Sequence, residues 1–107
     1  MTTIVQNSPY ATLINVFTVH PDNAEELAAL LTSATENVMQ HQPGFRSANI
    51  HLSTDRSRVV NYAQWDSAEA YRAMFSDNTA REHMAKAAAL AVSFDPNLYT
   101  VESVHER

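Results

Sequence analysis

Three side chains that donate hydrogen bonds are concentrated in one short stretch of the chain. Asn61 and Trp65 belong to a run rich in β-branched and aromatic residues, and Tyr71 follows a short polar break. Alternate residues of a strand share a face, so Asn61 and Trp65 point the same way, while Tyr71 falls in the second turn of the helix expected next. An amide, an indole N–H and a phenol can all bind an oxygen atom. The sequence therefore predicts a site for a polar aromatic ligand here.

Composition excludes several kinds of chemistry. The chain has 107 residues, of which 45% are hydrophobic, so residues 1–107 are expected to form one domain with a real core. It contains no cysteine, which excludes disulfides, thiolate metal sites and cysteine nucleophiles. Gly44 is the only glycine, so the glycine-rich loops that hold dinucleotides or nucleoside triphosphates are also excluded. A redox enzyme with this sequence would lack the usual cofactor motifs.

Charge and hydropathy predict which partners to expect. The formal net charge is −5, and seven Lys and Arg residues are spread along the chain without forming a basic stripe. Nucleic acid is therefore not an expected partner. No apolar run is long enough to span a bilayer, and the first residues show no signal-peptide pattern, so we expect no membrane partner and a cytoplasmic location.

The order of elements predicts a fold class. Two capping-box patterns, Asn23 with Glu26 and Asp66 with Glu69, mark expected helix starts, and Pro96 lies in an expected turn. The order is β-α-β-β-α-β, which indicates an α+β, ferredoxin-like fold with a four-stranded antiparallel sheet covered on one face by helices. The expected strands are 10–19, 45–53, 58–65 and 98–105, and the expected helices are 23–41, 67–75 and 80–92.

One face of this sheet would be left open by the helices. Apolar side chains of the first two strands are expected on it, namely Ile14, Val16, Ala48, Ile50 and Leu52. An apolar face of this kind is an aggregation hazard unless a partner covers it. We therefore expect a homodimer in which two sheets pack face to face, a dimeric α/β barrel-type assembly.

Polar and aromatic residues of the opposite parity are expected beneath the helices. Buried amide, imidazole and indole groups need partners, which a ligand in a pocket between sheet and helices would supply. The predicted substrate-binding residues of the strands are Asn15, Phe17, Asn49 and His51.

The run Val59–Trp65, together with residues 43–48, 53–55 and 70–72, resembles the antibiotic biosynthesis monooxygenase (ABM) family. The resemblance covers about residues 43–72 and implies a dimeric, ferredoxin-like protein. It further implies oxidation of anthrone-type polycyclic phenols to quinones by molecular oxygen, with neither metal nor flavin as cofactor. Asn61, Trp65 and Tyr71 match the family's pocket residues, so the resemblance makes these three the predicted catalytic residues. A family arginine on the last helix corresponds to Ala85.

The chemistry of such a substrate can be considered without the family. Loss of an acidic C–H from an anthrone gives an electron-rich anion that can pass an electron to oxygen directly. The protein must then bind the anion, and a base would speed its formation. His51 and His83 are the candidates for that base, and Met74 and His83 complete the predicted substrate-binding set. No two histidines are three or four residues apart, so no metal site is predicted.

Three alternatives remain open at the level of sequence. A haem-binding or haem-degrading relative of the same fold would use Asn15 and His83, but the tryptophan expected shortly before the histidine falls near Ala73 or Met74, and neither can replace it. A non-catalytic dimeric module, which binds a phenolic metabolite or assists a cyclisation, would carry the same pattern. Finally, Trp65, Tyr71 and Met74 also fit ordinary core positions.

Overall fold

The structure, a computed structural model, describes all 107 residues. Its strands form one antiparallel sheet in the order β2-β3-β1-β4, and the ferredoxin-like prediction is confirmed. The elements are β1 (Ala11–Thr18), α1 (Pro21–Asn37), η1 (Met39–His41), β2 (Phe45–Leu52), β3 (Arg58–Trp65), α2 (Ala68–Ala73), η2 (Met74–Ser76), α3 (Asn78–Leu90) and β4 (Ser93–Tyr99).

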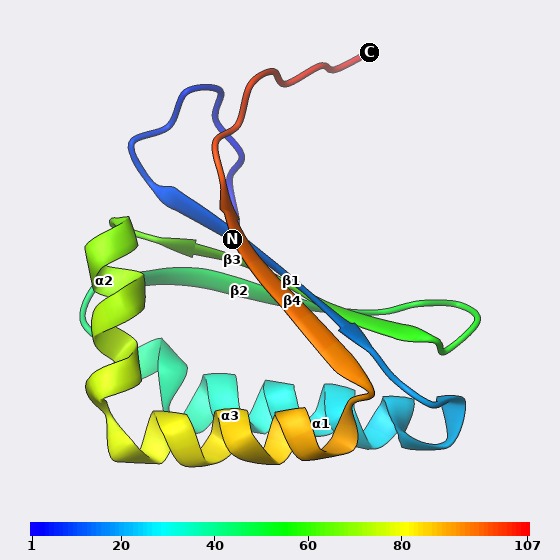
Figure 1. Cartoon of the computed structure of the whole chain (residues 1–107). Helices are drawn as coiled ribbons and strands as arrows, with labels where there is room; N and C mark the ends of the chain where they lie inside the picture. Colours follow the sequence, from blue (N-terminus) through cyan, green and yellow to red (C-terminus); the bar gives the residue numbers. More distant parts are fainter.

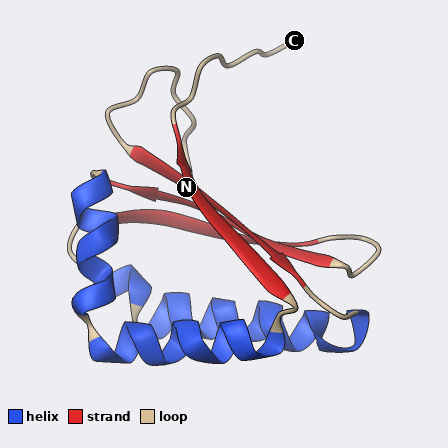
Figure 2. Ribbon diagram, in the orientation of Figure 1, coloured by secondary structure: helices blue, strands red, loops and turns tan.

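The helices lie on one side of the sheet only. Figure 1 shows α1 and α3 running side by side along one face, with α2 standing at the end of the layer. The other face of the sheet carries no helix, as Figure 2 shows by colour, and the C-terminal tail extends away from the body. None of these helices is both long and apolar enough to cross a membrane.

Each helix begins earlier or with a different cap than the sequence pattern indicates. His20, not Asn23, caps α1 by accepting a hydrogen bond from the Asp22 amide at 3.2 Å, and Pro21 takes the first helical position. Ser67, not Asp66, caps α2 through its hydroxyl, which accepts from the amide of Ala70 at 3.0 Å.

The last helix has a strong N-terminal cap. The Asp77 carboxylate accepts from the amide of Ala80 at 2.9 Å, so α3 begins two residues before the predicted start. This backbone bond, with a second bond from the Gln42 side chain, holds the pKa of Asp77 below its usual value. The cap fixes the start of α3, which packs against α1.

The prediction for the last strand is wrong. The turn expected at residues 95–97 is part of β4, which runs from Ser93 to Tyr99 and pairs with β1. Because β4 is an edge strand, the missing N–H of Pro96 can face away from its single neighbour, and the pairing tolerates it. The correction brings Phe94 into the sheet, opposite Phe17.

The faces of β2 are also the reverse of the prediction. The register shifts between Phe45 and Ser47, so Arg46 is an extra residue in a β-bulge. Past this point the alternation changes phase. Consequently Asn49 and His51 lie on the open face, because they pair with Tyr62 and Val60, and the residues that face the helices are Ala48, Ile50 and Leu52.

The chain's own N-terminus covers part of the open face. The Asn49 amide donates to the hydroxyl of Thr2 at 2.7 Å and to the carbonyl oxygen of Tyr62 at 3.1 Å. The Gln64 amide donates to the carbonyl oxygen of Thr3 at 2.8 Å. The amides of Asn49 and Gln64 therefore have hydrogen-bond partners within the protein, and their role is to hold the N-terminal segment against the sheet.

Gly44 connects the turn before β2 to the start of α2. Its φ is +85°, in the left-handed region, and its carbonyl oxygen accepts from the amide of Asp66 at 2.7 Å. A Cβ placed here would lie 2.5 Å from Cβ of Ala70. The turn thus needs glycine both for its conformation and for the close approach of α2.

We expect Gly44→Ala to lower the free energy of unfolding by about 1 to 3 kcal/mol, because it adds backbone strain to a steric clash. Urea denaturation measures the change. In an Ala70→Gly background the clash is removed, so the same substitution should cost less. Equal costs in the two backgrounds would contradict the steric part of this account.

Candidate functional site

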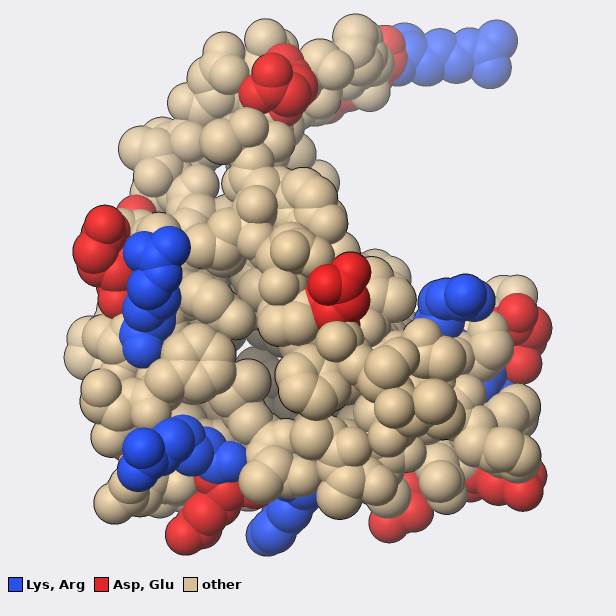
Figure 3. All heavy atoms as spheres, viewed as in Figure 1, with Lys and Arg blue, Asp and Glu red and all other residues tan.

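A cavity of about 110 Å³ lies between the sheet and the helices. It separates two groups of core residues, one around Trp65 and Tyr71 and the other around Phe17 and Leu27. Figure 3 shows the surface hollowed between the sheet and α3, with mainly uncharged residues around the opening. The lining residues are Leu13, Asn15, Phe17, Leu31, Ala34, Thr35, Met39, Phe45, Ala48, Asn61, Ala63, Trp65, Tyr71, Met74, His83, Met84, Ala87, Ala88 and Phe94.

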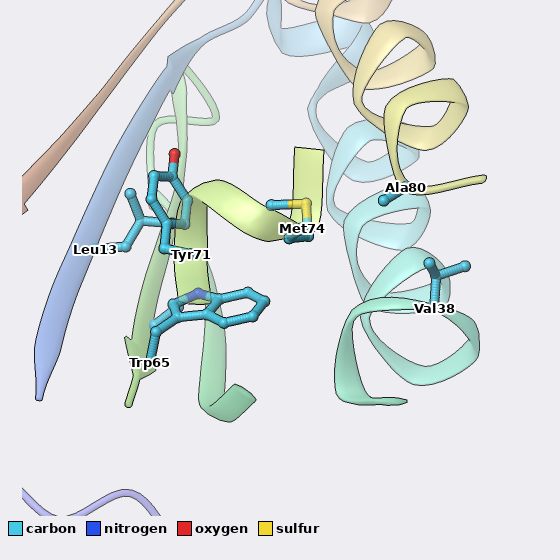
Figure 4. Packing of buried hydrophobic residues seen from close by; sticks show 7 residues of the cluster. Leu13, Val38, Trp65, Tyr71, Met74 and Ala80 are labelled. Atoms are coloured by element: carbon cyan, nitrogen blue, oxygen red, sulfur yellow. The ribbon is translucent and has the colours of Figure 1, made fainter. Parts of the chain in front are cut away.

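Aromatic rings form one end of this cavity. Trp65 is 2% exposed and meets Phe45 edge to face, with ring centroids 5.5 Å apart. Tyr71 also meets the indole edge to face, with ring centroids 6.1 Å apart. Figure 4 shows the two rings next to one another, with Met74 between them and Val38. The flat walls are suited to an aromatic ligand.

Burial changes the acidity of Tyr71. The side chain belongs to the buried core, and removal from water raises the pKa of its phenol above the usual value of 10.0. The hydroxyl therefore keeps its proton at neutral pH. It can donate a hydrogen bond to a ligand oxygen but cannot serve as a base there.

Three polar side chains in the cavity have a buried atom without a hydrogen-bond partner. They are Oδ1 of Asn15, Oδ1 of Asn61 and Nδ1 of His83. Asn15 and Asn61 are directly paired across β1 and β3, so their amides lie side by side. The fourth polar lining residue, Thr35, is satisfied by the carbonyl oxygen of Leu31 at 2.8 Å. Because native structures leave few buried polar atoms unpaired, these three mark a place for a ligand.

The cavity lining carries no permanently charged side chain, because none of the lining residues is Asp, Glu, Lys or Arg. No three side chains of the metal-binding types lie close enough together to hold a metal ion. His83 and Tyr71 are therefore the only lining residues with an ionisable side chain.

Comparison with known proteins gives the family. Residues 11–89 match the Antibiotic biosynthesis monooxygenase family. The chain belongs to this family. It is accordingly an oxidoreductase of the monooxygenase type, and the resemblance noted in the sequence is confirmed.

Individual ABM relatives agree with this assignment. The chain is 46% identical over 83 residues to tetracenomycin-F1 monooxygenase of Streptomyces glaucescens, covering 78% of this chain and 74% of the relative. A monooxygenase from the gene ActVA-Orf6 of Streptomyces coelicolor, solved with the ligand nanaomycin D, is 28% identical with a TM-score of 0.77, covering 92% and 91% of the two chains. SnoaB of Streptomyces nogalater, described as a cofactor-independent oxygenase, is 25% identical with a TM-score of 0.75, covering 91% of this chain and 97% of SnoaB.

The ABM fold brings most of the predicted site residues together. All three predicted catalytic residues line the cavity, and so do four of the six predicted substrate-binding residues: Asn15, Phe17, Met74 and His83. Asn49 and His51 do not, because the bulge at Arg46 turns them to the opposite face of the sheet. His51 is exposed there, and its Nδ1 contacts the carbonyl oxygen of Asn49.

Several lining residues of this ABM cavity were not predicted. Phe45 and Phe94 were missed although both are aromatic. Alternation with Asn49 and His51 would have placed Phe45 on the helix-covered face, whereas Phe94 was missed because the last strand was placed too late. Thr35 and Met39 come from α1 and η1, and Met84 from α3. Helical spacing alone could have placed Met84 beside His83, but it could not have shown which face meets the cavity.

The amide oxygen of Asn61 has no hydrogen-bond partner, so a substitution can test whether the fold needs this side chain. A buried amide oxygen without a hydrogen-bond partner lowers the free energy of unfolding by about 1 to 3 kcal/mol. Asn61→Leu removes this oxygen, so the melting temperature of the variant should equal or exceed that of the parent. Asn49→Leu, the matched control, should lower the melting temperature because that amide is bonded to Thr2 and Tyr62. Calorimetry of both variants compares them, and a large loss of stability in Asn61→Leu would contradict a ligand-directed role.

Proposed function

We propose that the chain oxidises an anthrone-like or other polycyclic phenolic substrate to a quinone with O2 and without a bound cofactor. The observation that carries this proposal is an aromatic-walled, uncharged cavity with amide, indole and phenol groups from Asn61, Trp65 and Tyr71. The relatives named for tetracenomycin F1, solved with nanaomycin D, or described as cofactor-independent support the same class of substrate and reaction.

The size of the cavity suggests how such a substrate would bind. A volume of about 110 Å³ is close to the space that encloses a single aromatic ring. We infer that the reacting ring lies against Trp65 and Tyr71, and that the remaining rings extend toward the opening seen in Figure 3. The apolar lining keeps bulk water away from the reacting carbon.

The reaction is balanced without a further reagent. A substrate methylene and O2 give a carbonyl group and one water, so the substrate supplies all the electrons that oxygen accepts. The protein has to stabilise the anion that reacts with O2. Asn61, Trp65 and Tyr71 do so by donating hydrogen bonds to the substrate oxygen on which the negative charge collects.

The same cavity bears on the haem alternative. Asn15 and His83 do line it, as a haem-binding relative would require. The tryptophan that this relative would carry shortly before the histidine falls near Ala73 or Met74, however, and neither side chain can replace it. An absorbance scan of the purified protein tests this alternative, since a Soret band would favour it.

We expect Trp65→Phe to lower the rate of O2 consumption with dithranol, an anthrone, about 10²-fold, because it removes one donor to the oxyanion and keeps most of the aromatic volume. An oxygen electrode measures the rate, with quinone formation followed by absorbance. His51→Ala on the opposite face is the control and should keep the parent rate. Absence of O2 consumption by the parent would favour a non-catalytic binding module instead.

We also propose that the protein is a homodimer that uses the open face of the sheet. Half-buried apolar and aromatic side chains of the central strands remain on that face, among them Ile14, Val16 and Tyr62. Exposed apolar patches favour association, and a second copy of the chain would bury these side chains. Light scattering after gel filtration should give twice the mass of one chain, and Val16→Glu should reduce that mass to one chain. A parent protein with the mass of one chain would contradict the proposal.

A further inference from the structure

We propose that His83 is the general base that removes the proton from the substrate carbon. The inference rests on the proposed function, because it assigns a role within that reaction. Sequence alone leaves two histidines open for this role. The structure separates them: His83 lines the cavity, whereas His51 is exposed on the far face of the sheet.

The location of His83 fits a base. It lies on α3 one turn before Ala87, and both residues face the cavity. Its Nδ1 is buried and has no protein partner, so one ring nitrogen is available to a ligand. Across the cavity lie the amides of Asn15 and Asn61, paired on the central strands. A substrate held by these amides is thereby placed between the sheet and the imidazole.

No other group in the cavity can take this proton near neutral pH. The residues that line it from α1, η1, β1, β2, β3, η2 and β4 carry no titratable side chain. From α2 only Tyr71 does, and because burial raises the pKa of its phenol it stays protonated. Glu82 and Lys86 on α3 are exposed and do not line the cavity. Imidazole is the side chain that ordinarily gains or loses a proton between pH 5 and 8.

The step conserves atoms and electrons. The substrate C–H bond breaks, a new N–H bond forms at Nδ1 of His83, and the electron pair remains on the substrate as a carbanion delocalised onto its oxygen. The carbanion's electron pair then forms a C–O bond to O2, which gives a carbon-bound peroxide. Breaking of the second C–H bond and of the O–O bond leaves one oxygen atom as the new carbonyl and releases the other, with the second substrate hydrogen, as hydroxide. The proton held by His83 returns to the departing oxygen, which restores the neutral imidazole.

Proton removal can be measured without oxygen. Under anaerobic conditions in D2O, the enzyme should exchange the methylene protons of dithranol for deuterium faster than buffer does, which NMR follows. His83→Gln keeps a polar side chain of similar length but cannot act as a base, and we expect it to lower both this exchange and the aerobic kcat/KM by about 10² to 10⁴-fold. His83→Asn is the second variant, for use where the first does not fold. Lys86→Ala, exposed on the same helix, should match the parent.

The pH profile provides a second readout. The parent kcat/KM should fall on the acid side, because a protonated imidazole cannot accept the substrate proton, and the variants should lose this dependence. Binding of dithranol, followed by the fluorescence of Trp65, the single tryptophan, should remain.

Each outcome decides between the two proposals. If His83→Gln exchanged the methylene protons as fast as the parent and its kcat/KM fell on the acid side as the parent's does, the role of His83 would be overturned. The proposed function would still stand. A parent protein that neither exchanges the protons nor consumes O2 would overturn both. Loss of exchange in His83→Gln with retained binding would support the assignment.

Discussion

The pairing of β1 with β3 is the constraint on which the rest of the site depends. These are the two central strands, and their register sets Asn15 directly opposite Asn61 on the face that the helices cover. Two amides in that place cannot reach bulk water freely and cannot pack like the leucine and valine side chains around them. The helices therefore cover the strands without filling the space, and a cavity remains between two groups of core residues. A one-residue slip in this register would turn the side chains of the slipped strand, and with them one of the two amides, to the open face and break up the site.

The polar side chains of the protein fall into two groups, those with hydrogen-bond partners within the fold and those in the cavity without them. Asn49, Gln64 and Asp77 are each bonded to backbone or side-chain partners, and they fix the N-terminal segment and the start of α3. Asn15 and Asn61 each have a buried oxygen with no partner in the protein. Stability alone would favour apolar residues at the latter two positions, because an unpaired buried polar atom costs free energy that a leucine would not. A ligand that donates hydrogen bonds to these oxygens would account for their presence.

The fold, the family and most of the predicted cavity residues could be derived from the sequence, and the failures have local physical causes. Alternation along β3 correctly placed Asn61 and Trp65 on one face, since that strand is regular over its whole length. Alternation failed on β2, because one extra residue, Arg46, reverses the phase, and no spacing rule reveals a bulge in advance. The start of β4 was missed because Pro96 suggests a turn, and whether a proline is tolerated depends on which strand lies at the edge of the sheet. Both failures concern pairing between strands, which is a property of the assembled sheet and not of any single segment.

The uncharged lining of the cavity limits how an anion can form inside it. A carbanion or phenolate in apolar surroundings is costly unless its charge is met where it arises. A carboxylate base would place a second negative charge beside the substrate, and a permanent cation such as lysine or arginine would be costly to bury before the substrate arrives. A neutral imidazole avoids both problems, because it becomes a cation only when the substrate becomes an anion. In the proposed reaction the anion would form between hydrogen-bond donors, Trp65 on β3 and Tyr71 on α2, and the imidazole of His83 on α3, so that each charge created by proton transfer would face a group suited to its sign.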